Sequence, residues 1–176
     1  TARGEKALPV VAGPPTSRRG DLWLLGQHRL LCDDATDSAA VARLMNGRKA
    51  RTAFEDAPYN VKISGHVSGS GQHGEFVMAS GEMSDPEFTE FLTRTLTRTA
   101  ESLEDGGLVY FCMDFRHMRH VLDAADANSL KLLNLIIWDK KSGGMGSFYR
   151  SRHELIFLLA KGDSVHLNQV QLGRHG

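Results

Sequence analysis

Apolar residues recur with two different periods along this chain, and the change of period separates short strands from longer helices. Two short apolar runs, 21–25 and 29–32, flank Gly26-Gln27-His28 and predict a β-hairpin. Residues 50–54 predict another short strand. Strands of a sheet that is covered on both faces are apolar throughout. Three runs fit that description: 108–113, 132–138 and 155–160.

Helical periodicity lies between these runs. Asp37 is placed to cap a short helix that ends near Gly47. Ser84-Asp85-Pro86-Glu87 is a capping box with a first-turn proline, and it opens a longer helix that Gly106-Gly107 is expected to stop. The apolar face of that helix contains Phe88, Phe91, Leu92, Leu96 and Leu103. A further helix is predicted over 117–127, and the alternation of strands and helices predicts an α/β fold with a largely parallel sheet.

Composition narrows the class of protein. With 176 residues, 41% of them hydrophobic, the chain is long enough for one domain with its own core. Basic and acidic residues number 21 each, so a nucleic-acid partner must be held by local basic clusters rather than by a general positive field. This balance argues against a protein that only coats DNA.

The lack of recognisable targeting signals and the positions of the two cysteines predict a reducing compartment. The chain has no transmembrane-length apolar run and no signal peptide, so we expect no membrane partner and a cytoplasmic location. Cys32 and Cys112 each lie in an apolar run, and we expect both to be buried, unpaired side chains. Residues 1–19 are rich in proline and are interpreted as a linker.

The tetrapeptide Asp56-Ala57-Pro58-Tyr59 has the groups needed to bind a flat ring that bears an amino group. It follows the strand predicted over 50–54 and precedes a glycine-rich loop over 61–83. The Asp56 carboxylate and the Ala57 carbonyl can accept the two hydrogens of an exocyclic amino group on adenine or cytosine and draw its nitrogen toward a nucleophilic geometry. The Tyr59 ring can stack on the base. A base inside a duplex must be flipped out to reach such a site.

These four residues resemble the Asp-Pro-Pro-Tyr motif of DNA amino methyltransferases, in the permuted class that places this motif before the cofactor's glycine-rich loop. Further blocks, in the family's order, extend the resemblance to roughly residues 20–176. They are the opening strand 26–35, the helix-to-strand turn 104–111, and the two strands in 134–140 and 148–157. The resemblance implies a Rossmann-like methyltransferase sheet, S-adenosylmethionine as cofactor and double-stranded DNA as substrate.

Site residues follow from the same resemblance. It implies catalytic roles for Asp56, Ala57, Pro58 and Tyr59, and contacts to the cofactor from Asp34, Asp56 and Ala57. Methylation of adenine N6 is favoured over cytosine N4, because adenine is the commoner product of this permuted group. From the residues themselves, Asp34 has a second interpretation as a helix cap, and Asp114 is interpreted as a solvated loop residue rather than a cofactor contact.

Several positions depart from the family pattern. Ala57 replaces the first motif proline, Asp33 replaces a glycine, and Arg51 interrupts a strand that is usually apolar. The family's Asp-Pro-Phe-x-Gly-x-Gly loop has no counterpart up to Gly176. Residues 20–176 are therefore expected to form the catalytic half of a methyltransferase, completed by a C-terminal segment or a second chain. A degenerate, non-catalytic DNA-binding or assembly module is the alternative.

A basic segment is the candidate DNA contact. Phe148 and Tyr149 are interleaved with basic side chains, a combination that suits phosphates and bases. The basic residues are Lys140, Lys141, Arg150 and Arg152. The run 69–74 matches a dinucleotide fingerprint by letter, but it has no strand before it and no helix after it, so we interpret it as a loop. No metal site is expected, because the spacing around His153 and Glu154 provides no set of ligands.

Overall fold

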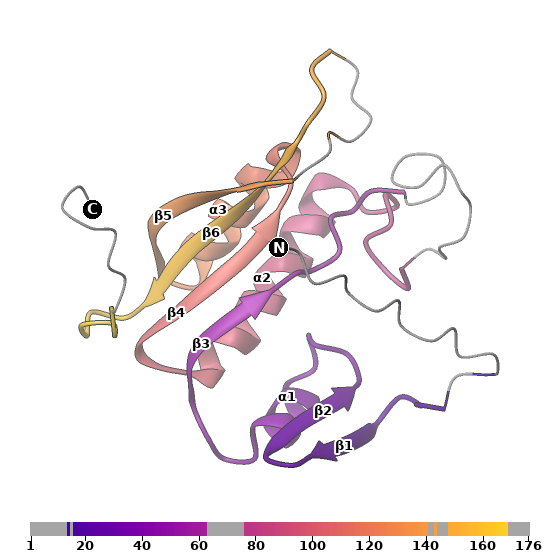
Figure 1. Cartoon of the computed structure of the whole chain (residues 1–176), viewed down its shortest axis with the longest axis vertical. Coiled ribbons are helices and arrows are strands. Elements are labelled where there is room, and N and C mark those ends of the chain that lie inside the picture. The colour runs from indigo at the N-terminus through magenta and orange to yellow at the C-terminus, as the bar shows by residue number, and fades with distance from the viewer. Residues whose placement is uncertain (1–13, 15, 63–75, 141–142, 144–147, 169–176) are drawn as a thin grey trace, which may run out of the picture.

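The computed structural model describes residues 14, 16–62, 76–140, 143 and 148–168 (Figure 1). The elements begin with the hairpin β1 (Asp21–Leu25) and β2 (His28–Cys32), the short helix α1 (Ser38–Met45) and the strand β3 (Ala50–Glu55). The long helix α2 (Asp85–Ser102), β4 (Leu103–Met113), a 3-10 turn η1 (Phe115–His117), α3 (Met118–Ala127), β5 (Leu130–Asp139) and β6 (His153–Lys161) follow. The predicted hairpin and all three predicted helices are confirmed.

The main sheet has the order β3-β4-β6-β5. The strand β3 runs parallel to β4, whereas β6 is antiparallel to both of its neighbours. An α/β fold is therefore confirmed, with a sheet of parallel and antiparallel strands in which β3, β4 and β5 run in one direction and β6 runs against them. The strand β6 lies between β5 and β4, and no described helix separates it from β5 in the chain.

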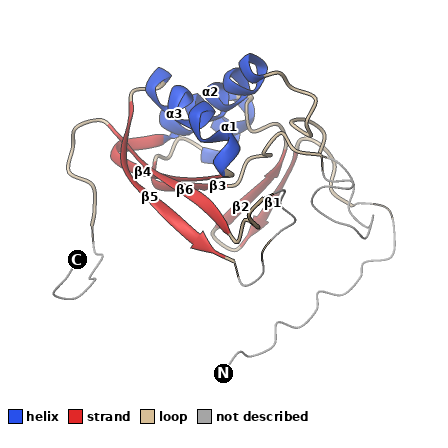
Figure 2. Ribbon diagram, turned by 90° about the horizontal axis from the view of Figure 1, so that it is seen from above, coloured by secondary structure: helices blue, strands red, loops and turns tan. Residues whose placement is uncertain are grey.

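The helices lie on one side of this sheet (Figure 2). Alternate residues of β4 and β6 face them, because successive side chains of a strand point to opposite faces. The resulting core is fully or almost fully buried. Its largest side chains are Phe88, Leu92, Leu96, Val109, Phe111, Met113, Val121, Phe157 and Leu159. The central strands β4 and β6 also bury their other face, as Leu108, Cys112 and Ile156 show.

The predicted burial of 132–138 is wrong in the described structure. All of β5 after Leu130 is exposed, and Trp138 exposes 57% of its surface. The strand lies at the edge of the described sheet, and no described helix covers the face opposite α2 and α3 (Figure 2). A continuous apolar run therefore identified the strand but not its place in the sheet.

The junction between α2 and β4 also differs from the prediction. The capping box of Ser84 and Glu87 is confirmed, but the helix ends at Ser102, and Gly106-Gly107 lie inside β4. Leu103 has extended backbone angles and belongs to the strand. The register of β3 against β4 shifts at this point, and a Cβ on Gly107 would lie 2.9 Å from the Glu104 carbonyl oxygen. The two glycines therefore permit an irregularity within a strand.

Cys112 is buried as expected, but Cys32 is exposed, because the hairpin β1–β2 is not covered by the main core. The run 69–74 lies outside the described residues. Among the described helices, none has the length and apolarity needed to cross a bilayer.

Candidate active site

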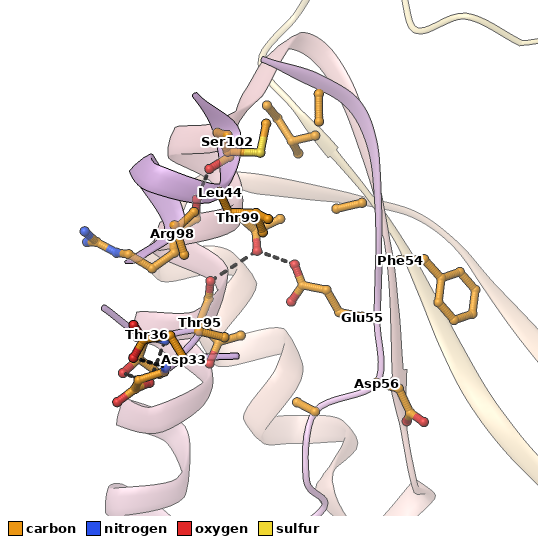
Figure 3. A pocket seen from close by; sticks show the side chains of 18 of the residues that line it. Asp33, Thr36, Leu44, Phe54, Glu55, Asp56, Thr95, Arg98, Thr99 and Ser102 are labelled. Carbon is orange, nitrogen blue, oxygen red and sulfur yellow. Dashed lines mark hydrogen bonds between the residues drawn. The ribbon is translucent and has the colours of Figure 1, made fainter. Parts of the chain in front are cut away.

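The residue Asp56 directly follows β3, and its neighbour Glu55 points to the other side of that strand (Figure 3). This arrangement follows from the alternation of side chains along an extended backbone. Glu55 faces Thr99 on α2, whereas the Asp56 carboxylate is exposed and points away from the helix. The tetrapeptide therefore presents its carboxylate at the end of the strand rather than in the core.

Tyr59 holds one oxygen of this carboxylate. Its hydroxyl group donates a hydrogen bond to Asp56 Oδ1 over 2.8 Å. The Tyr59 ring is half-buried and packs, with Ala57, against the hydrophobic core. Burial and the adjacent Asp56 carboxylate raise the pKa of the Tyr59 hydroxyl above its usual value, so this group remains a proton donor. Stacking of Tyr59 on a base remains a prediction.

Three strands end at the same edge of the sheet as Asp56. The strand β5 is antiparallel to β6, which is antiparallel to β4, so β3, β4 and β5 all run in one direction. Their carboxyl ends therefore share an edge, where ligands of open α/β sheets bind. In the chain, Asp56 follows β3, Asp114 follows β4 and Lys140 follows β5.

A cavity of about 560 Å³ lies between β3, α1 and α2. The structure brings four predicted site residues to its wall: Asp34, Asp56, Ala57 and Pro58. Tyr59 is not part of this wall. Eight of the nine residues from Ala50 to Pro58 line the cavity, including residues from both faces of β3, so the cavity follows the free edge of this strand.

The family model described as DNA methylase matches residues 50–173, more than half of the chain. The chain belongs to this family. The match begins with β3 and includes Asp56 to Tyr59, but not Asp34.

No curated protein matches the chain in sequence. Among solved structures, those similar to this chain include one titled "crystal structure of M1.HpyAVI-SAM complex", with 15% sequence identity and a TM-score of 0.46. The alignment covers 73% of this chain and 52% of that chain, so this methylase chain spans about half the length of that protein.

Asp34 is half-buried at the start of a turn in the methylase chain. Its Oδ1 atom accepts hydrogen bonds of 2.8 Å from both the backbone nitrogen and the hydroxyl group of Thr36, and these bonds lower the pKa of the Asp34 carboxyl group. The helix cap is instead Asp37, which accepts from Ala39 and Ala40. The interpretation of Asp34 as a helix cap is therefore wrong, and its contact with a cofactor remains a prediction.

Like Asp37, Asp114 caps a helical turn, and it is not a solvated residue. Its side chain is 16% exposed and accepts hydrogen bonds from the backbone of Arg116 and His117 and from the His117 ring. The prediction of a solvated Asp114 is therefore wrong, because the 3-10 turn after β4 needs an acceptor at its start.

Sequence reasoning missed Glu55. Thr99 donates a hydrogen bond to its Oε1 atom, whereas Oε2 is buried without a hydrogen-bond partner among the described residues. Burial raises the pKa of the Glu55 carboxyl group to about 7. The sequence contained an indication of this role: Glu55 directly precedes Asp56, so its side chain must point to the opposite face of the strand, toward the helices.

The basic segment is partly neutralised within the methylase chain. The Lys140 ammonium group lies 2.6 Å from Glu154 Oε1, and the Arg152 guanidinium group makes two 2.6 Å hydrogen bonds to the Asp139 carboxylate. Arg150 is exposed and has no ion pair with any described residue. Lys141 lies outside the described residues. Of the three described residues among the predicted DNA contacts, Arg150 is therefore the one whose charge is least compensated.

Proposed function

We propose that this chain carries the catalytic half of an S-adenosylmethionine-dependent DNA methyltransferase. Its substrate is the exocyclic amino group of a base flipped from double-stranded DNA, with adenine N6 favoured over cytosine N4. One observation carries the proposal. Within a DNA methylase match, the exposed Asp56 carboxylate stands at the carboxyl edge of the sheet, where the Tyr59 hydroxyl group fixes one of its oxygens.

The wall of the cavity suits S-adenosylmethionine, which combines a flat nucleoside with a positively charged sulfonium and an ammonium group. Apolar residues of α1 and β3 line this wall together with the acidic residues Asp33, Asp34 and Asp56, and Glu55 adds a buried oxygen that has no hydrogen-bond partner among the described residues. Arg98 is the only basic residue among those that line it. We assign Asp34, Asp56 and Ala57 to hold this cofactor, which supplies a methyl group bonded to an electron-poor sulfur.

The residues of the tetrapeptide then prepare the nucleophile. The free lone pairs of the Asp56 carboxylate accept one amino hydrogen of the base, and the Ala57 carbonyl accepts the other. These bonds withdraw the nitrogen lone pair from conjugation with the ring and so prepare it for attack. The bound cofactor would supply the methyl group, with the C–S bond lost as the N–C bond is gained. The Asp56 carboxylate accepts the proton that the amino group loses.

Residues 20–176 are proposed as the catalytic half, and residues 1–19 as a linker. A C-terminal segment or a second chain would add the glycine-rich loop around the methionine end of the cofactor. Completion by a further segment or chain is supported by the position of β3, which lies beside the cavity at the edge of the described sheet.

Transfer of tritiated methyl groups from S-adenosylmethionine to unmethylated genomic DNA tests the function. With the segment or chain that completes the cofactor site present, we expect incorporation into DNA by the wild-type protein and a loss of at least ~10²-fold with Asp56→Ala, because a group aimed at the developing charge is removed. Digestion and chromatography of the product distinguish N6-methyladenine from N4-methylcytosine. DNA binding without methyl transfer by the wild type would support the non-catalytic alternative, which the alanine at position 57 favours.

A further inference from the structure

Asn60, the residue after the tetrapeptide, has an unusual backbone and an unusually well-connected side chain. Its φ angle is +54°, in the left-handed region that asparagine tolerates better than most residues. Its Oδ1 atom accepts hydrogen bonds from the backbone nitrogens of Gly81, at 3.0 Å, and Met83, at 3.2 Å. Its Nδ2 atom donates to the Met83 carbonyl oxygen over 2.8 Å. One side chain therefore joins two segments that are more than 20 residues apart.

The segment that Asn60 holds is itself firmly anchored. Ala79 is fully buried in the core, and its backbone nitrogen donates to Glu82 Oε1 over 2.5 Å. Met83 is followed at once by Ser84, whose capping box with Glu87 begins α2. Asn60 is therefore bonded to a part of the molecule that the core and the start of a long helix hold in place.

A short series of contacts connects this anchor to the reactive carboxylate. Met83 bonds to Asn60, Asn60 is covalently joined to Tyr59, and Tyr59 donates to Asp56 Oδ1. Apart from this tie, the tetrapeptide is held by its connection to β3 and by the packing of Ala57 and Tyr59 against the core.

We infer that Asn60 is the positioning residue of this site: its three hydrogen bonds fix the exit of the tetrapeptide, and thereby the Tyr59 hydroxyl group and the Asp56 carboxylate. This inference rests on the proposed methyl transfer. Asn60 does not touch the substrate base. Its effect is to hold a near-attack geometry, whose loss by about 1 Å costs on the order of 10²-fold in rate.

Two substitutions separate the backbone requirement from the hydrogen bonds. Asn60→Gly keeps access to a positive φ and removes all three side-chain bonds. Asn60→Asp keeps the acceptor for Gly81 and Met83 and also tolerates this backbone region. The matched control is Asn46→Gly, because Asn46 also has a positive φ, of +50°, but ends α1 and does not line the cavity.

In methyl transfer, we expect Asn60→Gly to lower kcat roughly 10- to 100-fold, with KM for DNA and for S-adenosylmethionine unchanged within about twofold. We expect Asn60→Asp to recover most of the lost kcat and Asn46→Gly to keep the wild-type value. A wild-type kcat in Asn60→Gly would overturn the inference. A loss of kcat in Asn46→Gly equal to that in Asn60→Gly would also overturn it, because the effect would then be one of general stability.

A second readout needs no catalysis. Ionisation of Tyr59 is followed by phenolate absorbance between pH 8 and 11, as the difference between each protein and its Tyr59→Phe derivative. We expect no Tyr59 ionisation in this range in the wild type and in Asn60→Asp. In Asn60→Gly we expect ionisation near the usual value of about 10, because Tyr59 is released from Asp56 and from its packing. If the wild type transfers no methyl group, the proposed function fails, and this titration alone decides the role of Asn60. An unchanged titration in Asn60→Gly overturns it.

Discussion

The hydroxyl group of Tyr59 lies 2.8 Å from Asp56 Oδ1 and donates a hydrogen bond to it. The two residues are three positions apart, and the rigid Pro58 between them limits the conformations of the turn. The aromatic residue of the tetrapeptide therefore orients the carboxylate, in addition to any stacking on a base. This second role is testable, because the hydroxyl group can be removed without removing the ring.

The substitution Tyr59→Phe should lower kcat for methyl transfer roughly tenfold, which corresponds to about 1.4 kcal/mol in the barrier. The ring would still stack, whereas the carboxylate would lose a fixed orientation. Steady-state kinetics with saturating DNA measure the effect, with Tyr110→Phe, in β4, as the control outside the tetrapeptide and the basic segment. Equal kcat values in Tyr59→Phe and the wild type would show that the hydrogen bond does not contribute to the reaction.

The substitution Ala57→Pro should keep or raise methyl transfer. Proline fixes φ near −65° and retains the carbonyl group that accepts the second amino hydrogen, so the turn loses freedom but no acceptor. The same transfer assay measures the effect, with thermal unfolding as a check on folding. A clear fall in kcat in a folded Ala57→Pro variant would show that alanine is required at this position.

The double substitution of Arg150 and Arg152 by alanine should weaken DNA binding for all sequences. The slope of the logarithm of the DNA-binding constant against the logarithm of salt concentration should also become less steep by up to about two, since each phosphate contact contributes roughly 0.9. Arg150 should account for most of the change, because Arg152 is already paired with Asp139. Fluorescence anisotropy at several salt concentrations measures the slope for each single variant. A slope that stays at the wild-type value in the double variant would mean that DNA binds elsewhere.

Glu55 should make stability depend on pH. The pKa of the Glu55 carboxyl group is about 7 in the folded protein, above its ordinary value of 4.5, so this group binds a proton more tightly in the folded state than in the unfolded state. The stabilisation that protonated Glu55 gives to the folded state is complete below about pH 4.5 and is lost as pH rises to about 7. The free energy of unfolding should fall by roughly 3 kcal/mol over this range. Denaturant unfolding from pH 4.5 to 7.5 measures it. Glu55→Gln should remove this dependence, whereas Glu90→Gln, at an exposed position of α2, should keep it.

The sequence specified local structure more completely than the packing of the sheet. Capping by Asp37 and Ser84 depends on neighbours in sequence, and both caps are present where their residue types predicted them. The exposure of β5 depends on which strands flank it, and an apolar run contains no information on strand order. The stop predicted at Gly106-Gly107 is wrong because glycine also permits irregular strands.

The candidate site was predicted in part for the same reason. Asp56 to Tyr59 form a contiguous motif, so their roles could be proposed from residue types alone. The ties of Glu55 to Thr99 and of Asn60 to Met83 join residues 44 and 23 positions apart, and only the fold brings them together. The ion pair of Arg152 with Asp139 likewise depends on the β5–β6 pairing.

The free edge of β3 has a practical consequence for anyone who handles this protein. Among the described strands, β3 pairs with β4 alone, and Phe54 is 62% exposed beside that open edge. Open edges recruit other extended chains, and concentrated solutions offer many of them. We therefore expect turbidity to increase with concentration during storage. Phe54→Lys should delay it, since a charged side chain on an edge strand opposes the approach of a second sheet. Light scattering over a dilution series would compare the aggregation rate of Phe54→Lys with that of the wild type.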